Sequence, residues 1–277
     1  MTQETEKTFI HDGCALKYYE QGRGDPMLLL HGFGASSYSW RYLFQSFSET
    51  HRVLAMDLKG FGLSDKPTDD KYSVRDQSDI VADFIRKLGL DNLILGGNSF
   101  GGAVALLTCL QFMDSGPNPI RKMILIDSAG YKQRLPGFLT LLRTPLINQM
   151  GLTLVPGSVQ ARMILLKAFF GCTKITEEMV RTYGSYLDLP GAHQALIKTA
   201  QQIVPPDVDR IVRRYREIPV PVLIIWGEQD RIIPLSVGKK LKTEIPTSTL
   251  VTIPRCGHIP QEELPLETIR LISDFLQ

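Results

Sequence analysis

The stretch LILGGNSFGGAV, residues 93–104, places one serine between pairs of glycines directly after an apolar run. Ser99 has Gly97 two residues before it and Gly101 two residues after it. The residues before the glycines are typical of a buried strand, and those after them of a helix. Glycines at these two positions relieve the crowding of a sharp strand-to-helix turn, whose central side chain stays exposed. The stretch therefore predicts a serine hydroxyl held at one edge of a sheet, where a helix begins.

His258 is the histidine best placed to act as a base for Ser99. It lies in the loop IPRCGHIPQEE, which follows the last apolar strand. That loop belongs to the carboxyl edge of a parallel sheet, where α/β proteins bind their ligands. A serine hydroxyl is a poor nucleophile until such a base takes its proton. The remaining histidines are interpreted as structural, surface or packing residues: His11, His31, His51 and His193.

Two aspartates compete for the role of the carboxylate that orients this base. Asp230 lies in LIIWGEQDRIIP, in the loop after a buried strand, and Asp127 closes the strand at Met123–Ile126. Both therefore belong to the carboxyl edge of the sheet. Glu228 follows its strand too closely to be the first choice. We favour Asp230 and interpret Asp127 as a partner of the turn that follows it, but the sequence leaves both open.

The stretch LLLHGFGASSYSW supplies a second loop at the same edge, after the apolar strand at Met27–Leu30. Gly32 and Gly34 let its backbone approach a substrate closely. When a serine attacks a carbonyl carbon, negative charge develops on the oxygen and needs N–H donors. The backbone N–H groups of Phe33 and Phe100 are the expected pair.

Apolar runs alternate with helical patterns along most of the chain. Two short alternating segments, Thr8–Ile10 and Ala15–Tyr19, predict an antiparallel hairpin at the start. The later runs are continuous, as in buried parallel strands, and Ser73 with Asp76 forms a capping box before one of the helices between them. This predicts an α/β fold with a mostly parallel central sheet flanked by helices. The parallel strands are expected at Met27–Leu30, Arg52–Met56, Leu93–Leu95, Met123–Ile126, Val222–Trp226 and Thr249–Ile253.

The segment from about Tyr131 to Ile218 lacks a convincing strand pattern and contains helix-like stretches divided by glycine and proline. It predicts a helical lid over residues 131–218, inserted into a core domain of residues 1–130 and 219–277. We expect this lid to determine the substrate, through apolar residues that roof the site. The candidate contacts are Phe138, Leu142, Met163 and Phe170.

Composition and charge limit the classes of partner. The 277 residues carry 31 basic and 29 acidic side chains, a formal net charge of +2, without a basic block or an acidic tail. A small-molecule substrate is therefore expected, in a monomer or a homodimer, whereas nucleic acid and membrane are not expected partners. The four cysteines form no CxxC pair and the N-terminus lacks an apolar signal segment, which predicts a reduced, cytoplasmic protein.

No motif in the chain calls for a cofactor or a metal. The run Gly60-Phe61-Gly62 is not a dinucleotide fingerprint, because position 65 is aspartate and no helical pattern begins there. A Walker loop and an HExxH motif are both missing from the sequence. We therefore expect neither a metal nor an organic cofactor.

Taken in order along the chain, these stretches resemble the α/β-hydrolase family, and the likeness covers essentially the whole chain. The family places its nucleophile, acid and base in the order found here for Ser99, Asp230 and His258. It also carries helical lids after its sixth strand, where residues 131–218 fall. The stretches that carry the likeness are His31–Gly34, Asp57–Ser64, Gly97–Gly102, Gly227–Asp230 and Gly257–His258, and the resemblance implies that Asp57–Ser64 is a structural turn.

The serine at position 99 distinguishes the branches of that family. Haloalkane dehalogenases and epoxide hydrolases carry aspartate there, so the resemblance implies a serine hydrolase, first of all one that cleaves carboxylic esters of small to medium apolar acyl or aryl groups through an acyl-enzyme. An alternative is a carbon–carbon bond hydrolase acting on ring-fission (meta-cleavage) products, which the run Gly97-Asn98-Ser99 resembles. Those enzymes commonly carry an aromatic residue after the base, where this chain has Ile259. An alternative of another class is a receptor-like member that binds a ligand with little turnover.

Overall fold

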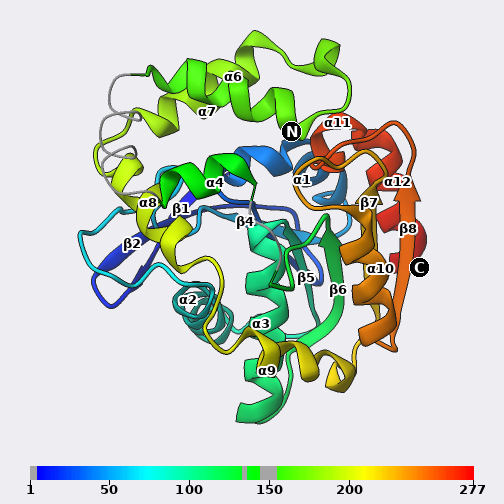
Figure 1. The fold of residues 1–277 in the computed structure, drawn as a ribbon. Coiled ribbons are helices and arrows are strands. Elements are labelled where there is room, and N and C mark those ends of the chain that lie inside the picture. The colour runs from blue at the N-terminus through cyan, green and yellow to red at the C-terminus, as the bar shows by residue number, and fades with distance from the viewer. Residues whose placement is uncertain (1–4, 133–135, 144–154) are drawn as a thin grey trace.

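The computed structural model describes residues 5–132, 136–143 and 155–277. Its strands form one eight-stranded sheet in the order β1-β2-β4-β3-β5-β6-β7-β8 (Figure 1). β2 pairs antiparallel with β1 and β4, and the other neighbours pair parallel. The predicted α/β fold with a mostly parallel sheet is therefore confirmed. The strands are β1 (Thr5–His11), β2 (Cys14–Gln21), β3 (Pro26–Leu30), β4 (Arg52–Met56), β5 (Leu93–Asn98), β6 (Ile120–Ile126), β7 (Val222–Gly227) and β8 (Ser248–Ile253).

Local signals in the sequence fix where several elements begin and end. β1 and β2 form the predicted hairpin around a turn at Asp12 and Gly13, both of which have positive φ. Helix α2 (Val74–Lys87) begins at the predicted capping box: Ser73 Oγ accepts from Asp76 N at 3.2 Å, and Asp76 Oδ2 accepts from Ser73 N at 2.9 Å. These bonds satisfy N–H groups that have no acceptor within the helix.

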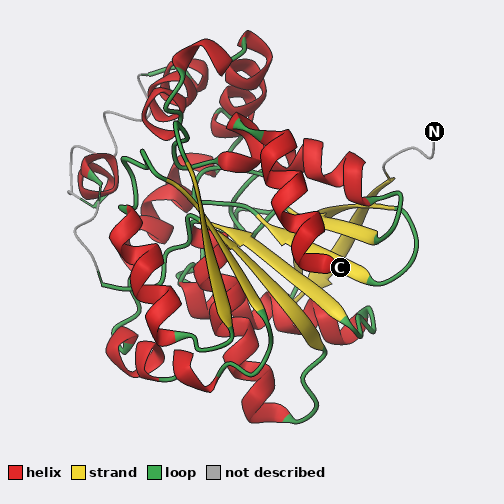
Figure 2. Cartoon of the chain, turned by 90° about the vertical axis from the view of Figure 1, so that its right-hand side faces the viewer, coloured by secondary structure: helices red, strands yellow, loops and turns green. Residues whose placement is uncertain are grey.

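The sheet separates two hydrophobic clusters, with helices packed against both faces (Figure 2). In β3, Leu28 and Leu30 face the cluster that α2 and α3 cover, whereas Met27 and Leu29 face the cluster that α1 and α12 cover. A strand with two apolar faces is therefore a continuous apolar run in the sequence. The other helices of this part are η1 (Ser37–Trp40), α1 (Arg41–Phe47), α3 (Phe100–Ser115), α10 (Leu235–Glu244), α11 (Pro260–Glu263) and α12 (Pro265–Leu276).

Helices fill the described part of residues 131–218, between β6 and β7, and no strand occurs in that part. Helices α4, α6 and α7 lie beyond the carboxyl ends of the parallel strands (Figure 1). The chain then returns along α3, where Arg214 donates to both carboxylate oxygens of Asp114 at 2.8 and 2.7 Å. The elements are α4 (Gly137–Leu142), α6 (Gly157–Ala168), η2 (Cys172–Lys174), α7 (Glu177–Leu187), α8 (Ala192–Gln202), α9 (Val208–Arg213) and η3 (Tyr215–Glu217).

The described helices differ in length and apolarity from a helix that crosses a bilayer. A spanning helix needs about 20 predominantly apolar residues. None of the described helices combines that length with sufficient apolarity.

Candidate active site

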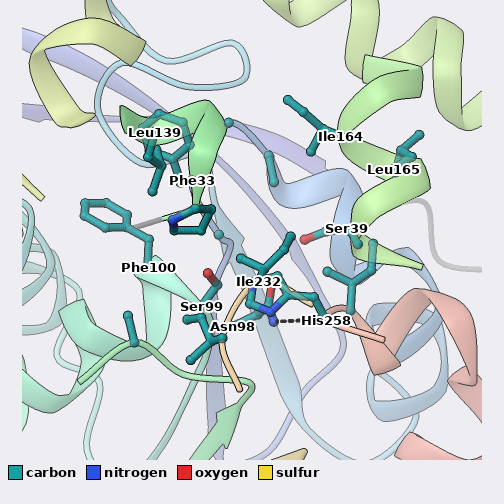
Figure 3. A pocket seen from close by; sticks show the side chains of 18 of the residues that line it. Phe33, Ser39, Asn98, Ser99, Phe100, Leu139, Ile164, Leu165, Ile232 and His258 are labelled. Atoms are coloured by element: carbon teal, nitrogen blue, oxygen red, sulfur yellow. Dashed lines mark hydrogen bonds between the residues drawn. The ribbon is translucent and has the colours of Figure 1, made fainter. Parts of the chain in front are cut away.

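Ser99 lies at the sharp turn between β5, which ends at Asn98, and α3, which begins at Phe100. Its φ of 53° and ψ of −116° belong to a region that non-glycine residues rarely adopt. Two main-chain hydrogen bonds hold it there: Ser99 N donates to Ile126 O at 3.0 Å, and Ser99 O accepts from Ala129 N at 3.0 Å. This conformation leaves the hydroxyl facing a cavity at the carboxyl edge of the sheet (Figure 3).

The glycines on either side of Ser99 leave the turn the space that it needs. A Cβ on Gly101 would collide with the carbonyl oxygens of Leu30 and His31, and a Cβ on Gly97 would collide with the main chain of Gly101. Because the obstructing atoms belong to the main chain, no rotation of a side chain would relieve the collisions. The glycine spacing seen in the sequence thus has a steric cause: the main chains of β3, β5 and the start of α3 lie too close together for a Cβ atom at these positions.

His258 and Asp230 form a hydrogen-bonded imidazole–carboxylate pair. Asp230 Oδ2 lies 2.7 Å from His258 Nδ1. Asp230 Oδ1 accepts from the main-chain N–H groups of Ile232 at 2.7 Å and Ile233 at 3.0 Å, which fixes the orientation of the carboxylate. The side chains are 6% exposed for His258 and 0% for Asp230, so water competes little for the contact. His258 lines the same cavity as Ser99. Its Nδ1 is the ring nitrogen that is hydrogen bonded to Asp230.

Asn98 connects the serine turn to the His258 loop. Its Nδ2 donates to the carbonyl oxygen of Ile126 at 3.0 Å and to that of His258 at 3.1 Å. The amide N of His258 donates to the carbonyl oxygen of Ala168, the last residue of α6, at 2.6 Å. The main chain of His258 is therefore held from the sheet on one side and from α6 on the other. This contact of Asn98 with the His258 loop was not predicted, although the amide beside the serine was the available signal in the sequence.

Asp127, the competing carboxylate, lies fully buried near Asp230. Its Oδ1 accepts from Gly227 N at 3.0 Å, whereas its Oδ2 is buried and has no hydrogen-bond partner among the described residues. Burial and the neighbouring Asp230 carboxylate raise the pKa of Asp127 well above its usual range. Asp127 therefore ties the end of β6 to the end of β7, and the carboxylate hydrogen bonded to His258 is that of Asp230.

Asp127, Asp230 and His258 also form a group of metal-ligand side chains. One candidate ligand atom from each residue lies within 4.8 Å of the others, the one such group found in the described part of the chain. Both oxygens of Asp230 already accept hydrogen bonds, from the imidazole and from the main chain. The arrangement therefore fits an oriented imidazole better than a metal centre.

The cavity beside Ser99 has a volume of about 1070 Å³, part of it open to solvent. Ser99, His258, Phe33 and Phe100 all line it (Figure 3). Neither lysine nor arginine occurs among its described lining residues. Most of the lining is apolar, as in sites for small organic molecules. Part of that lining is one face of α6, formed by Ala161, Ile164, Leu165 and Ala168.

Three of the four predicted lid contacts, Leu142, Met163 and Phe170, are not among the described residues that line this cavity. Met163 and Phe170 are 61% and 38% exposed and do not line it. Leu142 packs beside Leu139, and of these two Leu139 lines the cavity. The reason is that α6 carries apolar residues on two faces, and the face with the smaller side chains is turned inward. The fourth candidate, the Phe138 side chain, lies outside the described residues.

Glu262 is a buried carboxylate in the cavity wall, four residues after His258. Its Oε2 accepts from Arg41 Nη1 at 2.6 Å, and its Oε1 accepts from Tyr183 Oη at 2.6 Å. Burial raises the pKa of Glu262, while Arg41 acts in the opposite direction. Because Tyr183 belongs to α7, this network joins the helices above the sheet to its edge. No sequence pattern predicted this network, since Arg41 and Glu262 are 221 positions apart.

His31 and Asp57 hold the loops around the site. His31 Nδ1 lies 2.7 Å from Gly32 O, and its Nε2 accepts from Leu58 N at 3.0 Å. Burial lowers the pKa of His31, and the donation from Leu58 requires the proton of the neutral ring to be on Nδ1. Asp57 accepts from two main-chain N–H groups at 2.7 and 2.8 Å. Both side chains use their polar atoms within the loops, as their structural interpretation requires.

Comparison with known proteins identifies the family. The model of the "Alpha/beta hydrolase family" matches residues 27–271, from β3 into α12. The chain belongs to the alpha/beta hydrolase family. The match covers Ser99, Asp127, Asp230 and His258, and it confirms the resemblance that the sequence motifs indicated.

Proteins similar to this alpha/beta hydrolase are named for different substrates. A 2-hydroxymuconate semialdehyde hydrolase of Pseudomonas putida is 30% identical over 281 residues, which cover 99% of this chain and 94% of the relative. The structure of a meta-cleavage product hydrolase of Pseudomonas fluorescens IP01 matches with a TM-score of 0.82 at 26% identity, covering 98% and 97% of the two chains. A membrane phospholipase A, described as a bacterial virulence factor, matches with a TM-score of 0.79 at 26% identity, covering 99% and 86%. The chain is therefore a hydrolase of this fold, and its relatives include hydrolases of more than one substrate class.

Proposed function

We propose that this alpha/beta hydrolase is a serine hydrolase that cleaves carboxylic esters with small to medium apolar acyl or aryl groups. The observation that carries the proposal is the hydrogen-bonded His258–Asp230 pair, which shares with Ser99 a largely apolar cavity. Residues 131–218 serve as the lid, inserted between the core segments 1–130 and 219–277. The lid face of α6 then bounds the space for the acyl or aryl group.

Ser99 acts as the nucleophile and His258 as the base and acid. His258 Nε2 takes the proton of Ser99 Oγ as that oxygen bonds to the carbonyl carbon, and Asp230 stabilises the charged imidazole through Nδ1. His258 then gives the proton to the alcohol oxygen as its bond to the carbonyl carbon breaks, leaving an acyl group on Ser99. His258 then takes a proton from a water molecule as the water oxygen bonds to the acyl carbon. As the bond between this carbon and Ser99 Oγ breaks, His258 returns the proton to Ser99 and the acid is released.

The main-chain N–H groups of Phe33 and Phe100 are the proposed oxyanion donors. Both residues line the cavity with Ser99 (Figure 3). Phe100 is the first residue of α3, where the N–H groups lack acceptors within the helix and the helix dipole favours negative charge. Phe33 lies in the loop after β3, opposite the start of α3. Loss of one such donor typically lowers the rate by about 10²- to 10³-fold.

The charge of the cavity wall favours an ester over an anionic substrate. A carboxylate buried in this cavity would need a cation to compensate the loss of hydration. The described lining contains no lysine or arginine, and the carboxyl group that it does contain, Glu262, is negative when ionised. An uncharged ester needs no compensating cation and is not repelled by an ionised Glu262.

Cleavage of a carbon–carbon bond is the second candidate, and the similarity to the Pseudomonas relatives favours it. Their names specify 2-hydroxymuconate semialdehyde and meta-cleavage products as the substrates of those proteins. Ser99 and His258 would serve such a reaction as well. The first of these substrates is an anion, however, which the lining described above is poorly suited to bind.

Hydrolysis of p-nitrophenyl esters from acetate to decanoate tests the proposal. We expect turnover by the wild type and a loss on the order of 10⁴-fold or more in Ser99→Ala. Ser185→Ala, on the exposed side of α7, serves as the matched control and should retain the wild-type rate. Failure of the wild type to hydrolyse any of these esters would refute the ester proposal. Turnover of a ring-fission dienoate by the same sample would then support the second candidate.

A further inference from the structure

The hydroxyl group of Ser39 lies in the wall of the cavity and is not explained by the fold. Ser39 is 2% exposed, and its Oγ has no hydrogen-bond partner among the described residues. Figure 3 shows this oxygen facing the cavity that Ser99 and His258 also line. A buried hydroxyl without a partner is unfavourable, and nearly all such groups in folded proteins are satisfied. A polar atom of a bound substrate would supply the missing partner.

Ser39 belongs to the side of the cavity that carries His258. It lies in η1, which packs against α11, the short helix that begins two residues after His258. Arg41, the first residue of α1 directly after η1, forms an ion pair with Glu262 of α11 at 2.6 Å. Tyr183 donates to the same carboxylate and lines the cavity as well. Ser39, Tyr183 and Glu262 therefore all contribute polar groups to the cavity that His258 lines.

The opposite side of the cavity is largely apolar. Phe33, Phe100 and Leu139 lie there, across Ser99 from Ser39 (Figure 3). Phe33 and Leu139 belong to one apolar cluster with Ile203, which also lines the cavity. Tyr131 adds a single hydroxyl to the lining, buried and without a partner among the described residues. Ile164, Leu165 and Ile232 lie on the side of Ser39 as well (Figure 3), so what distinguishes that side is the base His258 together with the unpartnered hydroxyl of Ser39.

The position of His258 assigns the two halves of an ester to the two sides. In ester cleavage by Ser99, the oxygen of the departing alcohol receives a proton from His258 while its bond to the carbonyl carbon breaks. The alcohol must therefore lie on the side of His258, which is the side of Ser39. The acyl chain then lies on the side of Phe33 and Phe100. From this placement, which rests on the proposed ester hydrolysis, we infer that the preferred substrates are esters of a polyhydroxy alcohol of the glycerol type, with a free hydroxyl of the alcohol bound to Ser39 Oγ.

The charges around Ser39 select a neutral hydroxyl over an ionised group. The carboxyl group of Glu262 already accepts from Arg41 and Tyr183, so it does not offer an unpaired negative charge to an amine. A phosphate or carboxylate on the alcohol would find no lysine or arginine in the described lining. A hydroxyl can both donate to and accept from Ser39 without carrying charge.

A pair of esters with the same acyl chain isolates the contribution of the alcohol. 1-Monooctanoylglycerol and propyl octanoate share the acyl group and the three-carbon alcohol, and differ in two hydroxyls. We expect the wild type to cleave the glycerol ester with the higher kcat/KM, and Ser39→Ala to reduce that preference by roughly 3- to 10-fold, the effect of one neutral hydrogen bond. Tyr131→Phe removes a hydroxyl from the cavity lining without touching Ser39, and it should change both esters by the same factor.

The possible outcomes separate this inference from the proposal on which it rests. If the wild type cleaves neither ester, the proposed ester hydrolysis fails and this inference fails with it. If it cleaves both without a preference for the glycerol ester, or if Ser39→Ala slows both equally, ester hydrolysis stands and the assignment of the alcohol side is wrong. A preference that Ser39→Ala reduces and Tyr131→Phe preserves supports the inference.

Discussion

Asp127 and Asp230 follow neighbouring strands and lie close together behind the same imidazole, but the hydrogen bond to His258 comes from Asp230. Asp230 Oδ2 lies 2.7 Å from His258 Nδ1, whereas Asp127 Oδ1 accepts from Gly227 N at 3.0 Å. The aspartate that ends β6 thus supports the end of β7, from which the loop with Asp230 begins. Two carboxyl groups at one edge of the sheet can therefore be assigned different roles on geometry.

The first prediction compares these two aspartates. Asp230→Asn removes the charge that stabilises the imidazolium and favours the wrong tautomer of His258, so kcat should fall on the order of 10³- to 10⁴-fold. Asp127→Asn keeps an acceptor for Gly227 N and should cost less than about 10-fold. The rates of p-nitrophenyl ester hydrolysis by the two variants test this prediction. An equal loss in the two variants would assign Asp127 a direct part in the reaction.

The second prediction concerns the pH dependence of stability. Burial raises the pKa of Asp127 above its usual 3.8, so the folded chain keeps this proton at pH values at which the unfolded chain has lost it. Where the folded state binds more protons, the free energy of unfolding falls as the pH rises. The wild type should therefore lose stability from about pH 4 upward, until the pKa of folded Asp127 is passed.

Asp127→Asn cannot ionise and isolates this contribution. Its melting temperature should exceed that of the wild type by a margin that grows as the pH is raised from 4 to 8. Thermal unfolding at a series of pH values measures the margin. A difference that stays constant over this range would show that Asp127 binds its proton equally in the folded and unfolded chain.

The sequence was sufficient to place the core of the site, because its geometry follows from the topology of the sheet. Parallel strands bring their carboxyl ends to one edge, so Ser99, His258 and Asp230 could be expected to meet once their strands were recognised. The choice between Asp230 and Asp127 could not be made in this way, since both follow strands at that edge. It depends on the loop after β7, where two main-chain N–H groups orient Asp230 toward the imidazole.

The lid shows which feature could not be predicted from the sequence pattern, namely which face of a helix is turned toward the cavity. In α6, Val159, Met163 and Leu166 lie at helical spacing and form one apolar face, while Ala161, Ile164, Leu165 and Ala168 form another. Periodicity cannot choose between two apolar faces. The larger side chains suggested the first, but the structure exposes it and turns the second toward the cavity. The small alanines on the inner face leave room for the cavity.

The third prediction tests this orientation of α6 with two adjacent residues. Ile164 lines the cavity, whereas Met163 is 61% exposed. Ile164→Ala removes apolar contacts with a bound substrate and should lower kcat/KM for p-nitrophenyl octanoate by about 10-fold. Met163→Ala should remain within about twofold of the wild type, because it lies outside the cavity. The opposite ranking of the two variants would mean that α6 presents its other face to the substrate.

The fourth prediction concerns Asn98, whose side chain holds the main chain of His258. Its Nδ2 donates to the carbonyl oxygens of Ile126 and His258 at 3.0 and 3.1 Å. Asn98→Asp replaces this donor by a carboxylate oxygen that both carbonyls repel, at nearly unchanged volume. The His258 loop should shift relative to Ser99, and because proton transfer depends on their alignment, kcat should fall by about 10- to 100-fold.

A readout besides activity distinguishes this positioning role from general destabilisation. The buried carboxylate of Asn98→Asp should itself take up a proton as the pH falls, and a protonated acid can again donate one hydrogen bond. The ratio of variant to wild-type kcat should therefore rise toward acid pH, within the range in which both proteins remain folded by circular dichroism. A ratio that does not change with pH, or a loss of activity that follows the melting temperature alone, would show that Asn98 does not act through the alignment of His258.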